Sequence, residues 1–288
     1  MPELPEVEAL VVDLRGRLDG RAIARVDLAT FSALKTFDPP LQAVHGAFVD
    51  GVHRHGKFLD IEAGGVHLVL HLARAGWIRW RDEVPKVPPK PSNKSPLAAR
   101  IVLDDGSGLD ITEAGTRKSL AMYVVRSPAD VEGIARLGPD PLSDDFTPAT
   151  LSAILDAAGR AQLKGVLRQQ GTIAGIGNAY SDEILHVARM SPFAPASGLD
   201  DEARQVLYDA IRSTLGDAVR RSVGHGAADL KGEKKAHMAV HGRTGETCPV
   251  CGDVVREVSF ADSSLQYCAT CQTGGKPLAD RRTSRFLK

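Results

Sequence analysis

The second residue of the chain has the most distinctive chemistry. The sequence begins Met1-Pro2-Glu3-Leu4, and an initiator methionine is commonly removed when a small residue such as proline follows it. Removal leaves Pro2 with a free secondary amine, and an N-terminal amine titrates near neutral pH, at about 7.7–8.0. Such an amine can attack a sugar or carbonyl carbon and form an iminium, the Schiff-base form of covalent catalysis. Glu3 is the neighbouring group that could supply or take the proton.

A helix start is the alternative interpretation of this segment. Pro5 suits a first helical turn, and Glu6 and Glu8 suit its positive end. This interpretation explains those three residues, but it leaves Pro2 and Glu3 without a role.

A cysteine module is the second group of residues that could carry out a chemical function, here metal binding. The sequence has 4 cysteines, in two CxxC pairs that are typical of a zinc ribbon. Four thiolates close the tetrahedral shell of one Zn²⁺ ion, so we expect the zinc to be structural. A redox role for one pair would leave the other unexplained, and a disulfide scaffold suits a cytosolic protein less well. We expect a β-hairpin between the two pairs. The spacing of the cysteines does not indicate which partner the module binds. The predicted ligands are Cys248, Cys251, Cys268 and Cys271.

The bulk composition describes an ordinary globular protein of more than one domain. The chain has 288 residues, of which 43% are hydrophobic and 25% charged, and its formal net charge is +0. A neutral balance means that any polyanion-binding face must come from segregated charge. No apolar run approaches a membrane span, and the acidic start is unlike a signal peptide. We therefore expect a cytoplasmic protein with no membrane partner.

The first half of the chain predicts a helix followed by a sheet. Apolar residues recur at helical spacing over residues 7–18, and Gly20 is the expected C-cap. Short strand-like runs follow without intervening helices, which favours an antiparallel β-sandwich or barrel. Residues 85–96 contain five prolines and predict a long loop. The expected strands are 23–28, 47–52, 58–61, 66–72, 77–80, 99–103 and 109–112.

The second half predicts helices and then the cysteine module. Residues 137–142 form a proline-glycine linker, and Thr147-Pro148 is a good helix start. Helical patterns cover 151–155, 163–169, 181–188 and 200–222, and a mobile loop is expected at 224–235. The fold class is therefore α+β and multidomain. The expected domains are 1–136 (β-sandwich), 137–235 (all-α), 236–275 (zinc finger) and 276–288 (basic tail).

Together these motifs resemble the formamidopyrimidine-DNA glycosylase / endonuclease VIII family. The resemblance is carried, in order, by PELPEVE, HGK at 55–57, LGPDPL, AGIGNAYSDE at 174–183, HGRTGETCPVCG and the paired CxxC motifs. It covers nearly the whole chain and is highly specific. It implies a β-sandwich, a helix–two-turns–helix domain and a zinc finger, which together hold damaged double-stranded DNA. It also implies base excision followed by strand cleavage.

The resemblance implies a role for individual residues. Pro2 corresponds to the nucleophile that attacks the anomeric carbon of the damaged nucleotide, and Glu3 to the acid that opens its sugar ring. Lys57 corresponds to a lysine at a phosphate beside the lesion; a solvated surface lysine is the alternative. Asn178 corresponds to a phosphate-binding asparagine of the helix–two-turns–helix. The residues themselves agree, since a glycine-rich turn that opens a helix exposes backbone donors to phosphate. Glu6 corresponds to a glutamate that orders the N-terminus.

Two departures from the family pattern concern residues that would enter the DNA stack. Arg74 occupies the position of a methionine wedge, and it could still fill the gap left by a flipped base. The family's Asp-Pro-Arg-Arg-Phe-Gly loop is replaced at residues 115–119. Arg117 is the candidate to keep the arginine's role there.

Two further departures concern the finger and the lid. Ser263 stands where the finger hairpin of the family carries a phosphate-binding arginine. The loop that covers 8-oxoguanine in the classical branch is altered at 224–235, which disfavours 8-oxoguanine as the preferred base. The basic tail is as consistent with a solubilising role as with DNA binding. The candidates to replace the finger arginine are Arg256, Arg281, Arg282 and Arg285.

The sequence thus predicts a monomeric DNA glycosylase and AP lyase of base excision repair with one structural zinc. Two alternatives remain open at this point. One is a glycosylase for bulky or cross-linked adducts, and the other is a damaged-DNA binder that keeps the fold without catalysis.

Overall fold

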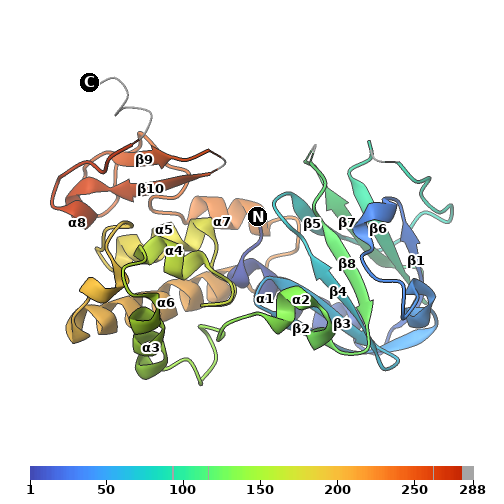
Figure 1. Ribbon diagram of the computed structural model, residues 1–288. Helices are drawn as coiled ribbons and strands as arrows, with labels where there is room; N and C mark the ends of the chain where they lie inside the picture. Colours follow the sequence, from blue (N-terminus) through green and yellow to red (C-terminus); the bar gives the residue numbers. More distant parts are fainter. Residues whose placement is uncertain (93, 116, 262, 281–288) are drawn as a thin grey trace. The chain divides into compact units, whose positions relative to one another are not determined.

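The chain folds into two compact units. The computed structural model describes residues 1–92, 94–115, 117–261 and 263–280 (Figure 1). One unit comprises residues 1–137 together with 219–231, and the other comprises residues 138–218 together with the chain from 232 onward. Among the described helices, none has both the length and the apolar character that a membrane span requires.

The first unit is built on an eight-stranded antiparallel sheet. Its strand order is β5-β7-β6-β1-β2-β3-β4-β8, so β2, β3 and β4 follow one another as successive hairpins. The strands are β1 (Ala22–Leu28), β2 (Ala47–His55), β3 (Phe58–Ala63), β4 (Val66–His71), β5 (Gly76–Arg81), β6 (Leu97–Leu103), β7 (Gly108–Glu113) and β8 (Ala121–Val125).

The sheet folds into two layers at its middle, where the pairing between neighbouring strands is short. Strands β1 and β2 pair only at Ala22 with Phe48 and at Ile23 with Ala47. Apolar side chains of β3 and β4 therefore lie in one core with those of β6 and β7. This confirms the predicted antiparallel sandwich, in the form of one sheet folded into two layers (Figure 1).

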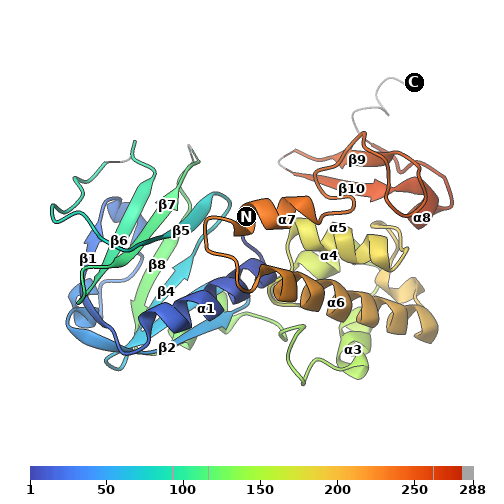
Figure 2. The ribbon, with the colours of Figure 1, turned by 180° about the vertical axis from the view of Figure 1, so that it is seen from behind.

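Helix α1 (Leu4–Leu18) packs against β2 and β3 (Figure 2). Its buried stripe includes Leu10 and Leu14, which belong to the core of the sandwich. Gly20 follows the helix with φ of +66°, the left-handed conformation in which glycine commonly ends a helix. The predicted helix is confirmed, and it begins three residues earlier than its apolar periodicity showed.

Strand β8 was not among the expected strands. Its sequence, Ala-Met-Tyr-Val-Val, is continuously apolar because both of its faces are covered. Met122 and Val124 lie in the sandwich core, while Val125 packs with Val69 and Val131 on the opposite face. A strand buried on both sides has no alternating pattern from which to recognise it.

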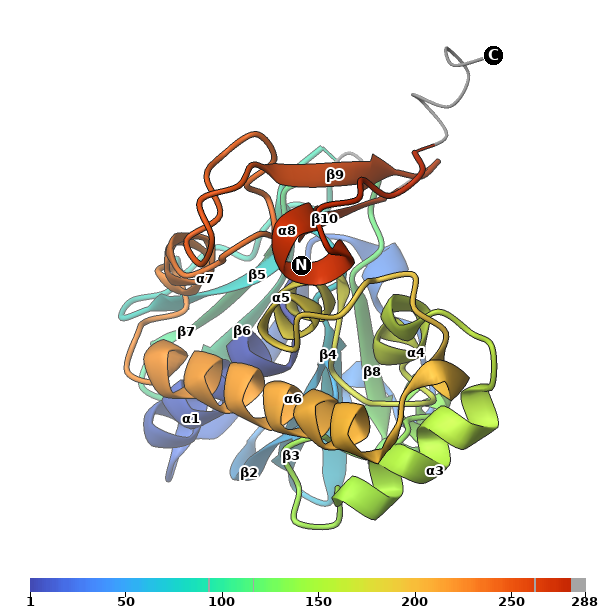
Figure 3. The ribbon, with the colours of Figure 1, turned by 90° about the vertical axis from the view of Figure 1, so that its left-hand side faces the viewer.

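The second unit is helical and ends in a two-stranded hairpin. The predicted start at Thr147 is confirmed, because its side chain accepts a hydrogen bond from the Thr150 amide (3.2 Å). Figure 3 shows the long helix α6 and the hairpin, which contacts α5 through β10. The elements are α3 (Pro148–Ala158), α4 (Leu163–Arg168), α5 (Asn178–Val187), α6 (Asp201–Ser222), β9 (Val255–Ser259), β10 (Ser264–Cys268) and α8 (Ala269–Thr273).

The prediction of a loop over residues 224–235 is wrong for its second half, from Leu230 onward. Helix α7 (Leu230–Ala236) forms there, and Leu230 is fully buried in the core of the first unit together with Ala227. The glycines and lysines of the segment suggested mobility, but two apolar side chains dock it. A short helix α2 (Glu132–Ala135) also covers part of the first unit.

We expect Leu10→Ala to lower the free energy of unfolding of the first unit by about 2–5 kcal/mol, because it leaves a cavity under α1. Val12→Ala is the matched control on the exposed face of the helix, where Val12 is 39% accessible, and it should change stability by less than about 0.5 kcal/mol. Both tryptophans, Trp77 and Trp80, lie in this unit, so denaturant unfolding followed by tryptophan fluorescence reports on it. Equal effects of the two substitutions would contradict the docking of α1.

Candidate active site and metal centre

The N-terminal residues are held by the first turn of α1. The Glu3 backbone N–H donates to Glu6 Oε2 at 2.8 Å, and the Val7 N–H donates to the Glu3 carbonyl at 3.0 Å. Glu6 is fully buried, and Pro2 and Glu3 are buried as well. A buried carboxylate that accepts an amide proton at the start of a helix fixes the chain direction there. The segment that carries Pro2 therefore has a defined position.

Lys57 lies in the turn between β2 and β3. Gly56 precedes it with φ of +56°, which suits the first position of a two-residue hairpin turn. Arg54 connects this turn to α1, since its Nε lies 2.6 Å from Glu8 Oε2 and its Nη1 donates to the Gly56 carbonyl at 3.4 Å. Lys57 itself is only 8% exposed. This excludes the solvated surface lysine that was the alternative interpretation.

The pKa of His71, at the end of β4, depends on the charge of Lys57. Its ring lies 4.7 Å from that of Phe58, centroid to centroid. Burial lowers the pKa of His71, and the positive charge of Lys57 lowers it further. The imidazole is therefore neutral at neutral pH, and a lysine ammonium lies close to it.

A buried carboxylate beside this turn was missed by the sequence reasoning. Asp60 is 0% exposed and accepts from two histidines, His55 Nε2 (3.1 Å) and His67 Nδ1 (3.1 Å). The three residues come from β2, β3 and β4, and His55 immediately precedes the turn that carries Lys57. The available signal was an aspartate between the apolar residues Leu59 and Ile61, because a buried carboxylate must find partners.

Arg74 lies at the tip of the turn between β4 and β5. The turn is tight: the Gly76 amide donates to the Leu72 carbonyl at 2.8 Å, and Ala73 has a positive φ of +50°. Arg74 is exposed at this tip. The wedge role expected for Arg74 stays a prediction.

Arg117 belongs to a loop that Glu113 organises. The buried carboxylate of Glu113 accepts from the Ser119 amide (2.8 Å) and the Leu120 amide (3.1 Å). Lys118 Nζ also donates to the Glu113 carbonyl (2.5 Å). Arg117 is exposed on this loop. Glu113 is a further residue that the sequence reasoning did not single out.

Asn178 is the first residue of α5, in the second unit. Its Nδ2 donates to the Ser264 carbonyl on the hairpin at 2.8 Å. Its Oδ1 is buried and has no hydrogen-bond partner among the described residues. The asparagine therefore connects the glycine-rich turn to the finger.

The four cysteines gather in the finger as expected. Their sulfurs all lie within 4.8 Å of one another, with 3.9 Å between Cys248 and Cys271. The edge of a tetrahedral zinc–thiolate site is about 3.8 Å, from a Zn–S distance near 2.3 Å. The cluster fits one structural zinc ion, and the hairpin predicted between the two pairs is confirmed.

Among the candidates for the missing finger arginine, Arg256 is engaged within the finger. Its Nη1 lies 2.9 Å from Asp253 Oδ2, and this ion pair lowers the pKa of Asp253 far below its usual range. Ser263 lies in the hairpin turn, where its carbonyl accepts from the Phe260 amide at 2.8 Å. The other three candidates, Arg281, Arg282 and Arg285, lie outside the described residues.

Comparisons with known proteins decide the family. Residues 1–122 match the formamidopyrimidine-DNA glycosylase N-terminal domain, 137–228 the H2TH domain of that enzyme, and 245–274 a zinc finger found in FPG and IleRS. A formamidopyrimidine-DNA glycosylase of Symbiobacterium thermophilum is 34% identical over 98% of this chain and 93% of its own length. The chain belongs to the formamidopyrimidine-DNA glycosylase family.

Other relatives in this family are similar over most of their own length. An uncharacterized formamidopyrimidine-DNA glycosylase-like protein of Mycobacterium tuberculosis is 61% identical over 53% of this chain and 94% of that protein. The crystal structure of MutM (Fpg) from Thermus thermophilus has 31% identity and a TM-score of 0.80, and covers 96% of this chain and 100% of its own. A structure of MutM in complex with DNA containing carbocyclic 8-oxo-G has 26% identity and a TM-score of 0.82, and covers 94% and 100%.

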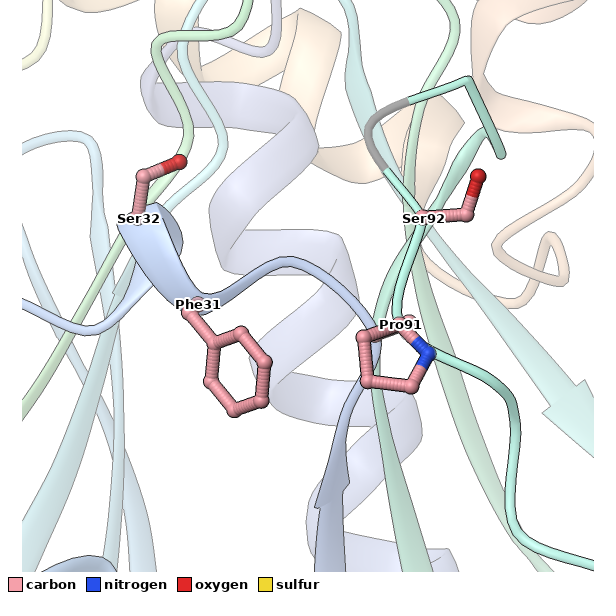
Figure 4. A pocket seen from close by; sticks show the side chains of 5 residues that line it. Phe31, Ser32, Pro91 and Ser92 are labelled. Carbon is pink, nitrogen blue, oxygen red and sulfur yellow. The ribbon is translucent and has the colours of Figure 1, made fainter.

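A surface pocket elsewhere in the first unit is lined by residues without acidic or basic side chains. Its volume is about 400 Å³, and Figure 4 shows Phe31 of η1 (Phe31–Ala33) beside Pro91 of the proline-rich loop. The lining residues carry no titratable group: they are Ala29, Phe31, Ser32, Pro91 and Ser92.

We expect Lys57→Gln to raise the pKa of His71, because it removes the ammonium that disfavours the imidazolium while the burial remains. The pKa should stay below the ordinary histidine value. An NMR titration of the His71 ring protons measures this shift. Lys35→Gln, which removes an exposed lysine of the same unit, is the control and should leave the titration unchanged. An unchanged pKa in the Lys57 variant would contradict the proximity of the two side chains.

Proposed function

We propose that the protein is a bifunctional DNA glycosylase and AP lyase of base excision repair. The observation that carries the proposal is the buried Pro2-Glu3 pair at the start of helix α1. The ion pair between Arg54 and Glu8 connects the same helix to the turn that carries Lys57. The arrangement supports the proposal because Pro2, Glu3 and Lys57 then belong to one connected framework, on which removal of Met1 would free the amine. The family to which the chain belongs supports the same chemistry.

In the proposed reaction the amine of Pro2, free once Met1 is removed, attacks the anomeric carbon of the damaged nucleotide and displaces the base. Glu3 protonates the sugar ring oxygen, and the ring opens to give an iminium between Pro2 and the sugar. Glu3, now a carboxylate, takes a proton from C2′ of the sugar, and the C3′–O bond breaks with the 3′ phosphate as the leaving group. Hydrolysis of the iminium then releases the enzyme. Lys57 holds a phosphate beside the lesion.

We propose double-stranded damaged DNA as the partner and a monomer as the active form. Asn178, the glycine-rich turn before it and the zinc finger are the proposed phosphate contacts of the second unit. Arg74 is proposed to fill the gap that the flipped nucleotide leaves, and Arg117 to face the opposite strand. Since the substrate would be chromosomal DNA, we place the protein with the nucleoid in the cytoplasm.

We propose a damaged base other than 8-oxoguanine as the preferred substrate. The segment 224–235 contains helix α7 in place of an extended lid loop, and the wedge position carries Arg74. A panel of duplexes with single lesions tests this. Preference for 8-oxoguanine would overturn it, and activity confined to bulky or cross-linked adducts would favour that alternative.

Borohydride reduction on a duplex with one abasic site tests the mechanism. We expect a stable covalent complex with the wild type and a loss of at least about 100-fold with Pro2→Gly, because the primary amine of glycine lacks the ring that fixes proline. Glu3→Gln should bind the duplex and cleave it at least about 100-fold more slowly, since the proton donor is lost. Gel analysis of the trapped and cleaved species measures both effects.

Pro5→Ala is the control, because it alters a buried proline of the same segment and leaves the amine intact. It should trap like the wild type. Intact mass before the assay establishes that Met1 is absent. Undiminished trapping with Pro2→Gly would overturn the role of Pro2, and tight binding to the abasic site without cleavage would favour a non-catalytic binder.

A further inference from the structure

We propose that His186, on helix α5, donates a hydrogen bond to the zinc-bound sulfur of Cys248. This residue lies outside the cysteine module and adds a side chain from the helical domain to the metal site. The distance from His186 Nε2 to Cys248 Sγ is 3.3 Å, and both residues are buried, with 4% and 1% exposure. His186 would act as a positioning residue for the thiolate, not as a zinc ligand.

The helix presents three polar side chains to the segment 241–264 along one stripe. Asn178, Asp182 and His186 are spaced at i, i+4 and i+8, so they lie on the same face of α5 over about 12 Å. Asn178 reaches the Ser264 carbonyl and Asp182 Oδ2 lies 2.8 Å from His241 Nδ1. His186 is the third contact in this row.

Neighbouring contacts hold the stripe in place. Glu183 accepts from the backbone amides of Ala239 (2.8 Å), Val240 (3.0 Å) and His241 (2.8 Å). Lys164, itself buried, pairs with Asp182 at 2.5 Å. The position of His186 against the sulfur is therefore fixed by several bonds around it.

The chemistry of the sulfur determines the tautomer of His186. A zinc-bound cysteine is a thiolate without a proton, so it can only accept. The facing Nε2 must then carry the hydrogen. Four thiolates and one Zn²⁺ carry a net charge of about −2, and an N–H donor stabilises that charge. Partners of this kind commonly alter metal affinity by about 10- to 100-fold.

Two substitutions separate the hydrogen bond from the shape of the side chain. His186→Phe keeps a planar ring of similar size and removes the donor. His186→Gln keeps an N–H group near the position of Nε2. The exposed histidine at 237, which pairs with Glu233, supplies the control His237→Phe. All four full-length proteins are loaded with zinc and titrated with a competing chelator, and their cobalt-loaded forms are recorded by absorption spectroscopy.

We expect His186→Phe to bind zinc at least about 10-fold more weakly. Its thiolate-to-cobalt charge-transfer band should move to longer wavelength, because an unbonded sulfur gives up electrons more easily. His186→Gln should recover most of both properties, and His237→Phe should match the wild type. Wild-type affinity and an unmoved band in His186→Phe would overturn the proposal, as would equal losses in the Phe and Gln variants. The band is read on the cobalt-loaded fraction, so a lower yield of folded protein does not obscure it.

Discussion

The docking of α1 onto the sheet is the constraint on which the proposed chemistry depends. The first residues of a chain normally fray, and a nucleophile placed there would have no fixed position. Here the apolar stripe that includes Leu10 and Leu14 is buried from the first turn onward, and Glu6 accepts the Glu3 amide. The same helix is joined to the β2–β3 turn through Glu8 and Arg54. The packing of one helix thus fixes both the segment that carries Pro2 and the turn that carries Lys57.

The second unit depends on a comparable arrangement around α5. That helix begins at the glycine-rich turn, and its polar stripe contacts the segment 241–264. The Glu183 carboxylate accepts hydrogen bonds from three successive backbone amides of the segment that leads into the finger. The zinc cluster is therefore part of one hydrogen-bonded body with the helix that opens at Asn178. These hydrogen bonds connect the cysteine cluster to the turn proposed to hold phosphate.

Much of the architecture could be predicted from local pattern. The spacing of Leu10 and Leu14 predicted α1, and the paired cysteines predicted the zinc cluster, because each signal lies within a short segment. The exceptions depend on tertiary contacts. Strand β8 is apolar on both faces, and α7 is ordered by Leu230 against a core that is distant in sequence. The partners of Asp60 come from two neighbouring strands, and the partner of His186 is 62 residues away. The hydrophobic periodicity of a single segment does not predict contacts between residues that are distant in sequence.

In the proposed reaction the amine of Pro2 forms the bond to the sugar, and every later step depends on that bond. The most direct measurement is mass spectrometry of the borohydride-trapped complex after proteolysis, which identifies the modified residue. We expect the sugar fragment to be attached to the N-terminal peptide beginning at Pro2, with Met1 absent. Attachment to a lysine such as Lys57, or an unmodified N-terminal peptide in a trapped complex, would contradict it.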